Sequence, residues 1–182
     1  MDSEVNIVIY FAHLDIDHSR INRAMCDAVR DLPHVNFRDL HELYPNFFIN
    51  VMAEQAVLRQ ADLIVFQHPI YWYGAPAIFK HFLDTVFLSG FAYGAGGTAL
   101  RDKDFLLALS TGAAAKEYQT NGIHHYPLEQ LILPMEQTVR FCGMRFLSPL
   151  VIHSGQNLTQ ESIKDHAQMY RQRLENYKLH PH

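Results

Sequence analysis

The chain has 182 residues, of which 48% are apolar, and it carries a formal net charge of −4 at pH 7. This length and composition predict an ordinary folded domain and exclude a disordered or fibrous protein. The negative charge argues against a nucleic-acid partner, and no apolar run approaches the roughly 20 residues that a membrane span needs.

Short apolar runs rich in β-branched residues alternate with segments whose apolar residues recur at helical spacing. The short runs predict buried strands, and the longer segments predict amphipathic helices. In chain order, we expect a strand over 6–12, a helix over 20–32, a strand over 35–40, a helix over 50–61, a strand over 62–68, a helix over 77–87, a strand over 104–111, a helix over 128–143, a strand over 146–153 and a helix over 159–178.

Residues that favour helix starts stand directly before several of these helices. Ser19, Asn50 and Thr159 are typical N-caps, and Pro76 stands where a helix tolerates proline best. Pro134 lies inside the fourth predicted helix, where it should either kink the helix or mark a late start.

The alternation of strands and helices predicts an α/β fold, a parallel sheet with helices on both faces. Five strands favour the flavodoxin-like order 2-1-3-4-5, in which ligands bind at the carboxyl ends of the strands. No cysteine or histidine pattern has the spacing of a metal site. Cys26 and Cys142 each fall in a helical pattern and are expected to be reduced thiols of the core.

The loops after the first, third and fourth predicted strands are candidates for ligand contacts. The first loop has no glycine, so it lacks the Gly-x-Gly-x-x-Gly fingerprint of a dinucleotide-binding domain. It contains Ser19 at a helix start, where a hydroxyl and the helix N-terminus can hold a phosphate group, although most capping serines only cap. After the third strand come Tyr71, Trp72 and Tyr73, and after the fourth comes the small polar stretch STGA.

The three adjacent rings allow two interpretations. They pack under a lid or against another subunit, or they border a flat conjugated ligand. With a phosphate near Ser19 and a small polar loop at 110–113, the second interpretation describes a flavin mononucleotide site. A receiver-type domain would instead need an aspartate at the end of the third strand, where this chain has Gln67 and His68.

Several longer motifs resemble one enzyme family, the flavodoxin-like NAD(P)H:quinone oxidoreductases. They are most similar to the bacterial quinone reductases that act as ancillary subunits of glutathione-regulated potassium-efflux systems. The similarity runs through YFAH, LYPNFFINVMAEQ, HPIYWYGAPAIFKHFLDTVFLSGFAYGAGGTAL, STGAAAKEYQTNGIHHYPL and RFCGM. It covers essentially the whole chain and implies a single flavodoxin-like flavin-binding domain over 1–182.

The resemblance implies a flavin held by three groups of residues and assisted by a catalytic pair. The groups are His13, Ser19, Arg20, Ile21 and Asn22 at the phosphate, the backbone of Ile70, Tyr71, Trp72 and Tyr73 at one border of the ring, and Ser110, Thr111, Gly112 and Ala113 along its other edge. Tyr118 and His124 match the tyrosine and histidine that assist hydride transfer in related animal-type enzymes. A phenol and an imidazole suit this role because they can stabilise developing negative charge; without the resemblance, both would be ordinary polar residues of a surface loop.

Two positions depart from the family pattern. Relatives usually have glycine at the position of Ala113, so the alanine would strain the loop if this residue needs a positive φ. Many relatives have glutamine at the position of Tyr71, so the substrate cleft is expected to differ in shape. Flavin contacts made by the backbone would be kept.

The resulting hypothesis is an FMN-dependent NAD(P)H:quinone oxidoreductase that reduces quinones by two electrons through ping-pong hydride transfer. FMN is favoured over FAD because the chain is short and the nearest relatives hold FMN, and either NADPH or NADH is the electron donor. The family implies a homodimer with the active site at its interface. The C-terminal helix and the aromatic loop are expected to contribute to that interface.

Two other functions stay open. One is a regulatory ancillary subunit of a glutathione-gated potassium-efflux transporter, with the reductase activity secondary, and the other is a flavodoxin-like electron carrier. The long segment 113–127 with its tyrosine and histidine favours a substrate cleft over a carrier. The residues before the first apolar run are acidic, whereas a signal peptide would be basic there. We therefore expect a cytoplasmic protein that reaches the inner membrane only through a transporter partner.

Overall fold

The computed structural model describes residues 5–153 and 158–178, and in them a parallel sheet forms the centre of the fold. Its strand order is β2-β1-β3-β4-β5, with β6 also paired to β4, and this confirms the predicted order. The acidic residues at the start of the chain lie outside the described residues. The strands are β1 (Ile7–Phe11), β2 (Val35–Asp39), β3 (Leu63–Pro69), β4 (Asp104–Ser110), β5 (Arg145–Phe146) and β6 (Leu150–Ile152).

The fifth predicted strand is divided into two short strands. β5 pairs with the start of β4, beginning at Arg145 opposite Asp104, and β6 pairs with its end, beginning at Leu150 opposite Ala108. The expectation of one strand over 146–153 is therefore wrong. Pro149 lies between the two pieces, and a proline has no N–H with which to continue a ladder.

The helices begin where the capping residues predict. Ser19, Asn50 and Thr159 each accept a hydrogen bond from a backbone N–H in the first turn of the following helix. The helices are α1 (Arg20–Val29), α2 (Leu40–Leu43), α3 (Val51–Gln60), α4 (Ala77–Val86), α5 (Leu128–Leu131), α6 (Leu133–Phe141) and α7 (Gln160–Glu175), with 3-10 turns over Ile16–His18 and Ala115–Glu117.

Two helical details differ from the predictions. Pro134 lies in the first turn of α6 and separates it from α5, so the single helix expected over 128–143 is wrong and the late start is correct. The short helix α2 was not predicted; the Asp39 carboxylate caps it by accepting from the backbone of His41 and Glu42. Cys142 ends α6, and both it and Cys26 are buried free thiols, as expected.

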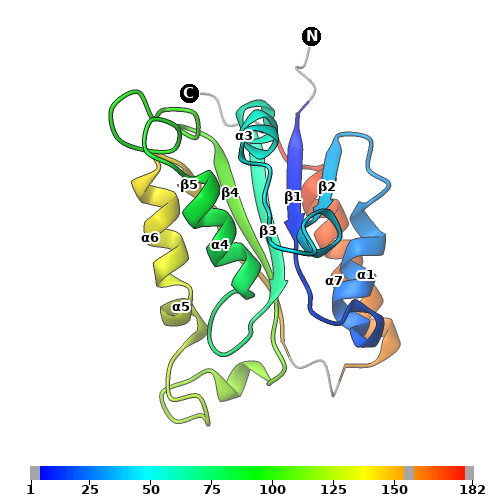
Figure 1. Cartoon of the computed structure of the whole chain (residues 1–182). Helices are drawn as coiled ribbons and strands as arrows, with labels where there is room; N and C mark the ends of the chain where they lie inside the picture. The colour runs from blue at the N-terminus through cyan, green and yellow to red at the C-terminus, as the bar shows by residue number, and fades with distance from the viewer. Residues whose placement is uncertain (1–4, 154–157, 179–182) are drawn as a thin grey trace.

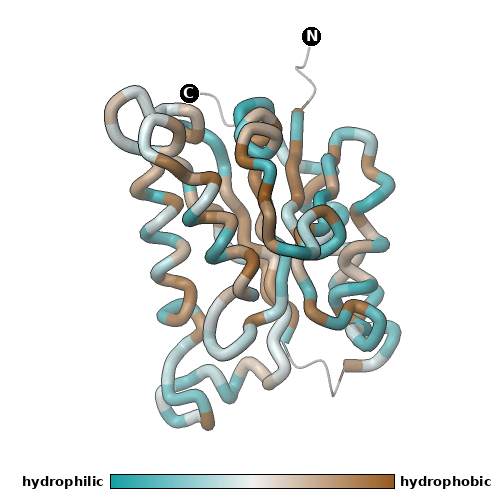
Figure 2. Tube along the Cα trace, in the orientation of Figure 1, coloured by the Kyte–Doolittle hydropathy of each residue, from teal (hydrophilic) through white to brown (hydrophobic). Residues whose placement is uncertain are grey.

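Two hydrophobic layers enclose the sheet (Figure 1). Side chains alternate along each strand, so Val8 and Tyr10 face α3, α4 and α6, whereas Ile7 and Ile9 face α1 and α7. Hydrophobic colour accordingly lies along the central strands, while the helices show mixed colours (Figure 2). The carboxyl ends of β3 and β4 point to the lower edge of the view in Figure 1, where the loops that follow them lie.

Candidate active site

The aromatic loop after β3 is a tight turn of unusual conformation. The backbones of Tyr71 and Gly74 exchange two hydrogen bonds, of 2.9 and 3.0 Å, across the turn. The two central residues have positive φ, 46° at Trp72 and 66° at Tyr73, which is the geometry of a type I′ turn. The side chain of Trp72 is 94% exposed. The turn therefore presents its backbone and one ring at the sheet edge, and Trp72 does not fill the core.

The loop after β1 contacts this turn through an imidazole. His13 Nδ1 accepts from the backbone N–H of Asp15 at 3.0 Å, so Nε2 carries the proton that meets the Tyr71 hydroxyl at 3.2 Å. Burial lowers the pKa of His13, while the carboxylate of Asp15 acts in the opposite direction. A neutral His13 therefore joins the ends of β1 and β3.

The start of α1 is tied to the end of β4 by one amide side chain. Asn22 Nδ2 donates to Ser19 Oγ at 3.0 Å and to Ser110 Oγ at 2.9 Å. Asn22 is only 2% exposed, and its Oδ1 has no hydrogen-bond partner among residues 5–153 and 158–178. A buried oxygen of this kind is costly to leave unpaired, so it fits a ligand that brings a hydroxyl or N–H donor.

The other two members of the predicted phosphate group lie on the same turn of α1. Ile21 is buried beneath the helix, so it can meet a ligand only through its backbone. The Arg20 guanidinium donates to Leu158 O at 3.4 Å and to Gln160 Oε1 at 3.2 Å, near the start of α7. The first turn of a helix offers N–H groups without intrahelical partners, which suits a phosphate.

The loop after β4 lies beside the aromatic turn. The backbone N–H of Ile70 donates to Ser110 O at 2.9 Å, and Thr111 Oγ1 donates to Ala113 O at 2.8 Å. Neither Gly112 nor Ala113 has a positive φ. The alanine that replaces the usual glycine therefore causes no backbone strain.

The structure brings the predicted catalytic pair together. The rings of Tyr118 and His124 stack with centroids 4.3 Å apart, and Tyr73 approaches His124 edge-on at 5.6 Å. Burial raises the pKa of Tyr118, while the Thr111 hydroxyl acts in the opposite direction. Both ring nitrogens of His124 are enclosed without a hydrogen-bond partner in the described part of the chain.

One residue of this cluster was missed by the sequence analysis. His153 follows β6, and its ring lies 5.8 Å from that of Tyr118. The signal was available, since the rule that ligands meet the carboxyl ends of parallel strands applies to the fifth strand as well as to the first, third and fourth.

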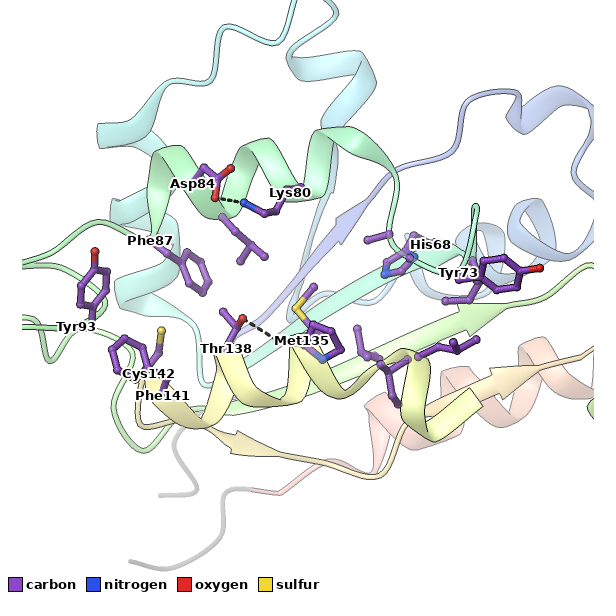
Figure 3. Close-up of a pocket in the computed structure, with 18 of the residues that line it drawn as sticks. His68, Tyr73, Lys80, Asp84, Phe87, Tyr93, Met135, Thr138, Phe141 and Cys142 are labelled. Atoms are coloured by element: carbon purple, nitrogen blue, oxygen red, sulfur yellow. Dashed lines mark hydrogen bonds and ion pairs between the residues drawn. The ribbon is translucent and has the colours of Figure 1, made fainter. Parts of the chain in front are cut away.

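The main cavity lies beside these loops rather than among them. It is a groove of about 510 Å³ between α4 and α6, with His68 and Tyr73 at one end and Tyr93 and Phe141 at the other (Figure 3). Of the predicted site residues, it includes only Ile70 and Tyr73. The groove is mostly apolar, so it is a hydrophobic surface adjacent to the candidate site.

The chain belongs to the family described as having a flavodoxin-like fold, whose profile matches residues 5–174. A glutathione-regulated potassium-efflux system ancillary protein, KefG from Yersinia enterocolitica, is 37% identical over 176 residues, which cover 97% of this chain and 96% of the relative. General stress protein 14 from Treponema denticola, solved in complex with FMN, has a TM-score of 0.89 and 31% identity over 93% of this chain and 98% of that one. An NADPH-quinone reductase from P. pentosaceus has a TM-score of 0.86 and 27% identity over 95% of this chain and 99% of that one.

Among the described residues, none of the helices is both long enough and apolar enough to cross a membrane.

Proposed function

We propose that the protein is an FMN-dependent NAD(P)H:quinone oxidoreductase, with 1–182 as its flavin-binding domain. The observation that carries this proposal is that contacts join three strand-end loops that carry enclosed polar atoms, Asn22 Oδ1 and the two nitrogens of His124, without a partner in the described part of the chain. When bound, the flavin would supply the redox chemistry by taking a hydride from NAD(P)H and passing two electrons to a quinone.

The start of α1 is suited to the phosphorylated tail of the cofactor. The backbone N–H groups of residues 20–22, the positive end of the helix and the Ser19 hydroxyl favour a phosphate. Asn22 bridges this helix start and Ser110 through Nδ2, and its Oδ1, which has no partner among residues 5–153 and 158–178, can accept from a hydroxyl of the sugar-alcohol chain. His13, in the loop before this helix, contacts the Tyr71 hydroxyl and so links the proposed phosphate site to the aromatic turn.

The two loops after β3 and β4 are suited to the flavin ring. The turn over 70–73 and the loop over 110–113 are joined by the hydrogen bond from Ile70 to Ser110. Both present backbone groups, and small side chains at 110–113 allow a ring to approach closely. The exposed ring of Trp72 would then lie outside the flavin contacts and shape the surrounding cleft.

Tyr118 and His124 are the proposed catalytic pair. Because burial raises the pKa of Tyr118, its phenol stays protonated near neutral pH and can donate a hydrogen bond to developing negative charge. His124 stacks on Tyr118, and its ring nitrogens, which have no partner in the described part of the chain, can donate or accept a hydrogen bond there. We assign the pair to electrostatic and proton support of the transfer.

The relatives support a flavin and favour FMN over FAD. The Treponema structure is named as an FMN complex, and the P. pentosaceus structure is named as an NADPH-quinone reductase. The test is to purify the protein, reconstitute it separately with FMN and FAD, and record visible spectra and dissociation constants. A protein that takes up neither flavin would refute the proposal. Steady-state rates with NADPH or NADH and a quinone should give parallel reciprocal plots if the cycle is ping-pong.

We propose that the active form is a homodimer that covers the groove between α4 and α6. Leu88, Tyr93 and Phe141 line this groove and leave a third or more of their surface exposed. Exposed apolar surface of this extent is typical of interaction sites. The apolar side of α7 packs inside the chain against α1, so α7 contributes less to this interface than the aromatic loop does.

A second function is supported by the potassium-efflux relative. We propose that the protein also acts as an ancillary subunit of a potassium-efflux transporter, which would hold a cytoplasmic protein at the inner membrane. The test compares potassium efflux in cells that carry the transporter with wild-type protein or with Tyr118→Phe and His124→Gln variants. Efflux that needs the protein but tolerates both variants would make the regulatory role primary and the reductase activity secondary.

A further inference from the structure

His153 lies next to the proposed flavin loop because of how β6 pairs. Leu150–Ile152 run parallel to the last three residues of β4, and the backbone N–H of Thr111 continues this ladder by donating to Ile152 O at 3.0 Å. The next residue, His153, therefore stands opposite Thr111, and its Nδ1 lies 3.1 Å from Thr111 Oγ1.

The hydrogen bonds of Thr111 favour one tautomer of His153. A threonine hydroxyl has one hydrogen to donate, and Ala113 O lies 2.8 Å from it. When the hydrogen goes to Ala113, the same oxygen accepts from His153, so the Nδ1–H tautomer of His153 satisfies both contacts. Burial lowers the pKa of His153, while Glu129 on α5 acts in the opposite direction. His153 is thus a neutral donor that supports the 110–113 loop from outside.

Tyr118 contacts two imidazoles. Its ring centroid is 4.3 Å from that of His124 and 5.8 Å from that of His153, and the side chain is buried. The Thr111 hydroxyl contacts His153 directly, and the His153 ring in turn lies beside Tyr118. His153 therefore contacts both the proposed flavin loop and a residue that the proposed reaction uses.

We propose that His153 is a positioning residue, which holds the 110–113 loop at the flavin edge through the Thr111 hydroxyl and supports Tyr118 through the contact between their rings. The inference rests on the proposed flavin-dependent function. A histidine that only filled space would need neither a defined tautomer nor a donor at Nδ1, and this difference can be measured.

The first test needs no flavin. Long-range ¹H–¹⁵N NMR spectra of the labelled full chain should show His153 as the Nδ1–H tautomer, with the signal assigned by its loss in a His153→Asn variant. Thr111→Val, which removes the oxygen acceptor but keeps the shape of the side chain, should abolish this preference. A wild-type His153 protonated at Nε2 would overturn the proposal.

The second test compares two replacements in the flavin-loaded protein. Asparagine keeps an N–H donor near the position of Nδ1, so His153→Asn should reduce its flavin with NADPH within about threefold of the wild-type rate. His153→Leu loses the hydrogen bond and should slow reduction about tenfold, while flavin affinity changes less than about threefold. His125→Asn is the matched control, because His125 is an exposed histidine of the 113–127 segment and has a positive φ that asparagine accepts.

Equal rates in the leucine and asparagine variants, whether both normal or both slow, would assign the residue to packing and overturn the positioning role. A protein that takes up no flavin would refute the proposed function, and the tautomer test would still decide the inference.

Discussion

Asn22 offers a sharp test of where the flavin chain runs, because its loss should affect folding and binding differently. In the flavin-free protein, Asn22→Leu removes two donated hydrogen bonds, to Ser19 and Ser110, each worth about 1 kcal/mol. It also removes an enclosed oxygen that has no partner among the residues the structure describes, which costs about 1–3 kcal/mol in the native state. These contributions nearly cancel, so the free energy of unfolding should change by less than about 1.5 kcal/mol.

For the free energy of flavin binding, the contributions of Asn22 do not cancel. The variant loses the acceptor at Oδ1, and it loses the bridge that fixes the start of α1 against Ser110. One lost hydrogen bond is worth about 1.4 kcal/mol at most, or about tenfold in affinity, and the loosened bridge adds to this. We expect the flavin dissociation constant to rise about tenfold or more.

The assays are urea denaturation of the flavin-free protein, followed by far-UV circular dichroism, and flavin titration followed by fluorescence. Gln67→Leu is the matched control, since Gln67 is a second buried amide whose Oε1 has no partner in the described part of the chain. Its Nε2 bonds to the Cys26 thiol instead of to a strand-end loop, so flavin affinity should not change. A variant of Asn22 that loses more than about 3 kcal/mol of stability and still binds flavin normally would refute the reasoning.

Three further predictions concern catalysis, pH and assembly. Tyr118→Phe and His124→Gln should each slow flavin reduction about 10²-fold in stopped flow with little loss of flavin, and unchanged rates would remove their role. Burial lowers the pKa of His68 to about 4, so the unfolded chain binds a proton that the native chain excludes between pH 6.5 and 4. The free energy of unfolding should thus fall by about 1.4 kcal/mol per pH unit as pH decreases through this window. Denaturation of His68→Leu at each pH should show a pH dependence that lacks the contribution of His68. Phe141→Glu should convert a dimer to monomers in light scattering, whereas a monomeric wild type would contradict the proposed interface.

Periodicity and capping were sufficient to predict most of the fold. The alternation of buried strands with amphipathic helices led to the parallel sheet and its order, and Ser19, Asn50 and Thr159 marked helix starts correctly. Apart from the missed short helix α2, the errors occur at prolines. Pro134 starts a helix and Pro149 divides a strand, and hydropathy does not report either effect because the flanking residues stay apolar.

The candidate site was predictable only at the level of loops. Parallel strands bring their carboxyl ends to one edge, so the residues after β1, β3 and β4 could be grouped without a structure. The contacts among these residues could not be predicted without a structure. The bridge from Asn22 to Ser110 spans 88 residues, and the contact of Thr111 with His153 depends on the register of β6 against β4.

The turn at Trp72 and Tyr73 explains why three rings stand together on a loop. Type I′ turns favour asparagine and glycine, and a left-handed conformation costs other residues about 1–2 kcal/mol each. Burial of Trp72 does not offset this cost, because the ring is 94% exposed. The backbone hydrogen bonds of Tyr71 with Gly74 and of Ile70 with Ser110 hold the turn in place. Strain kept by surrounding contacts at a strand end is typical of functional sites. We therefore propose that the backbone of this turn is the part fitted to a ligand, and that the exposed rings serve the substrate or a second subunit.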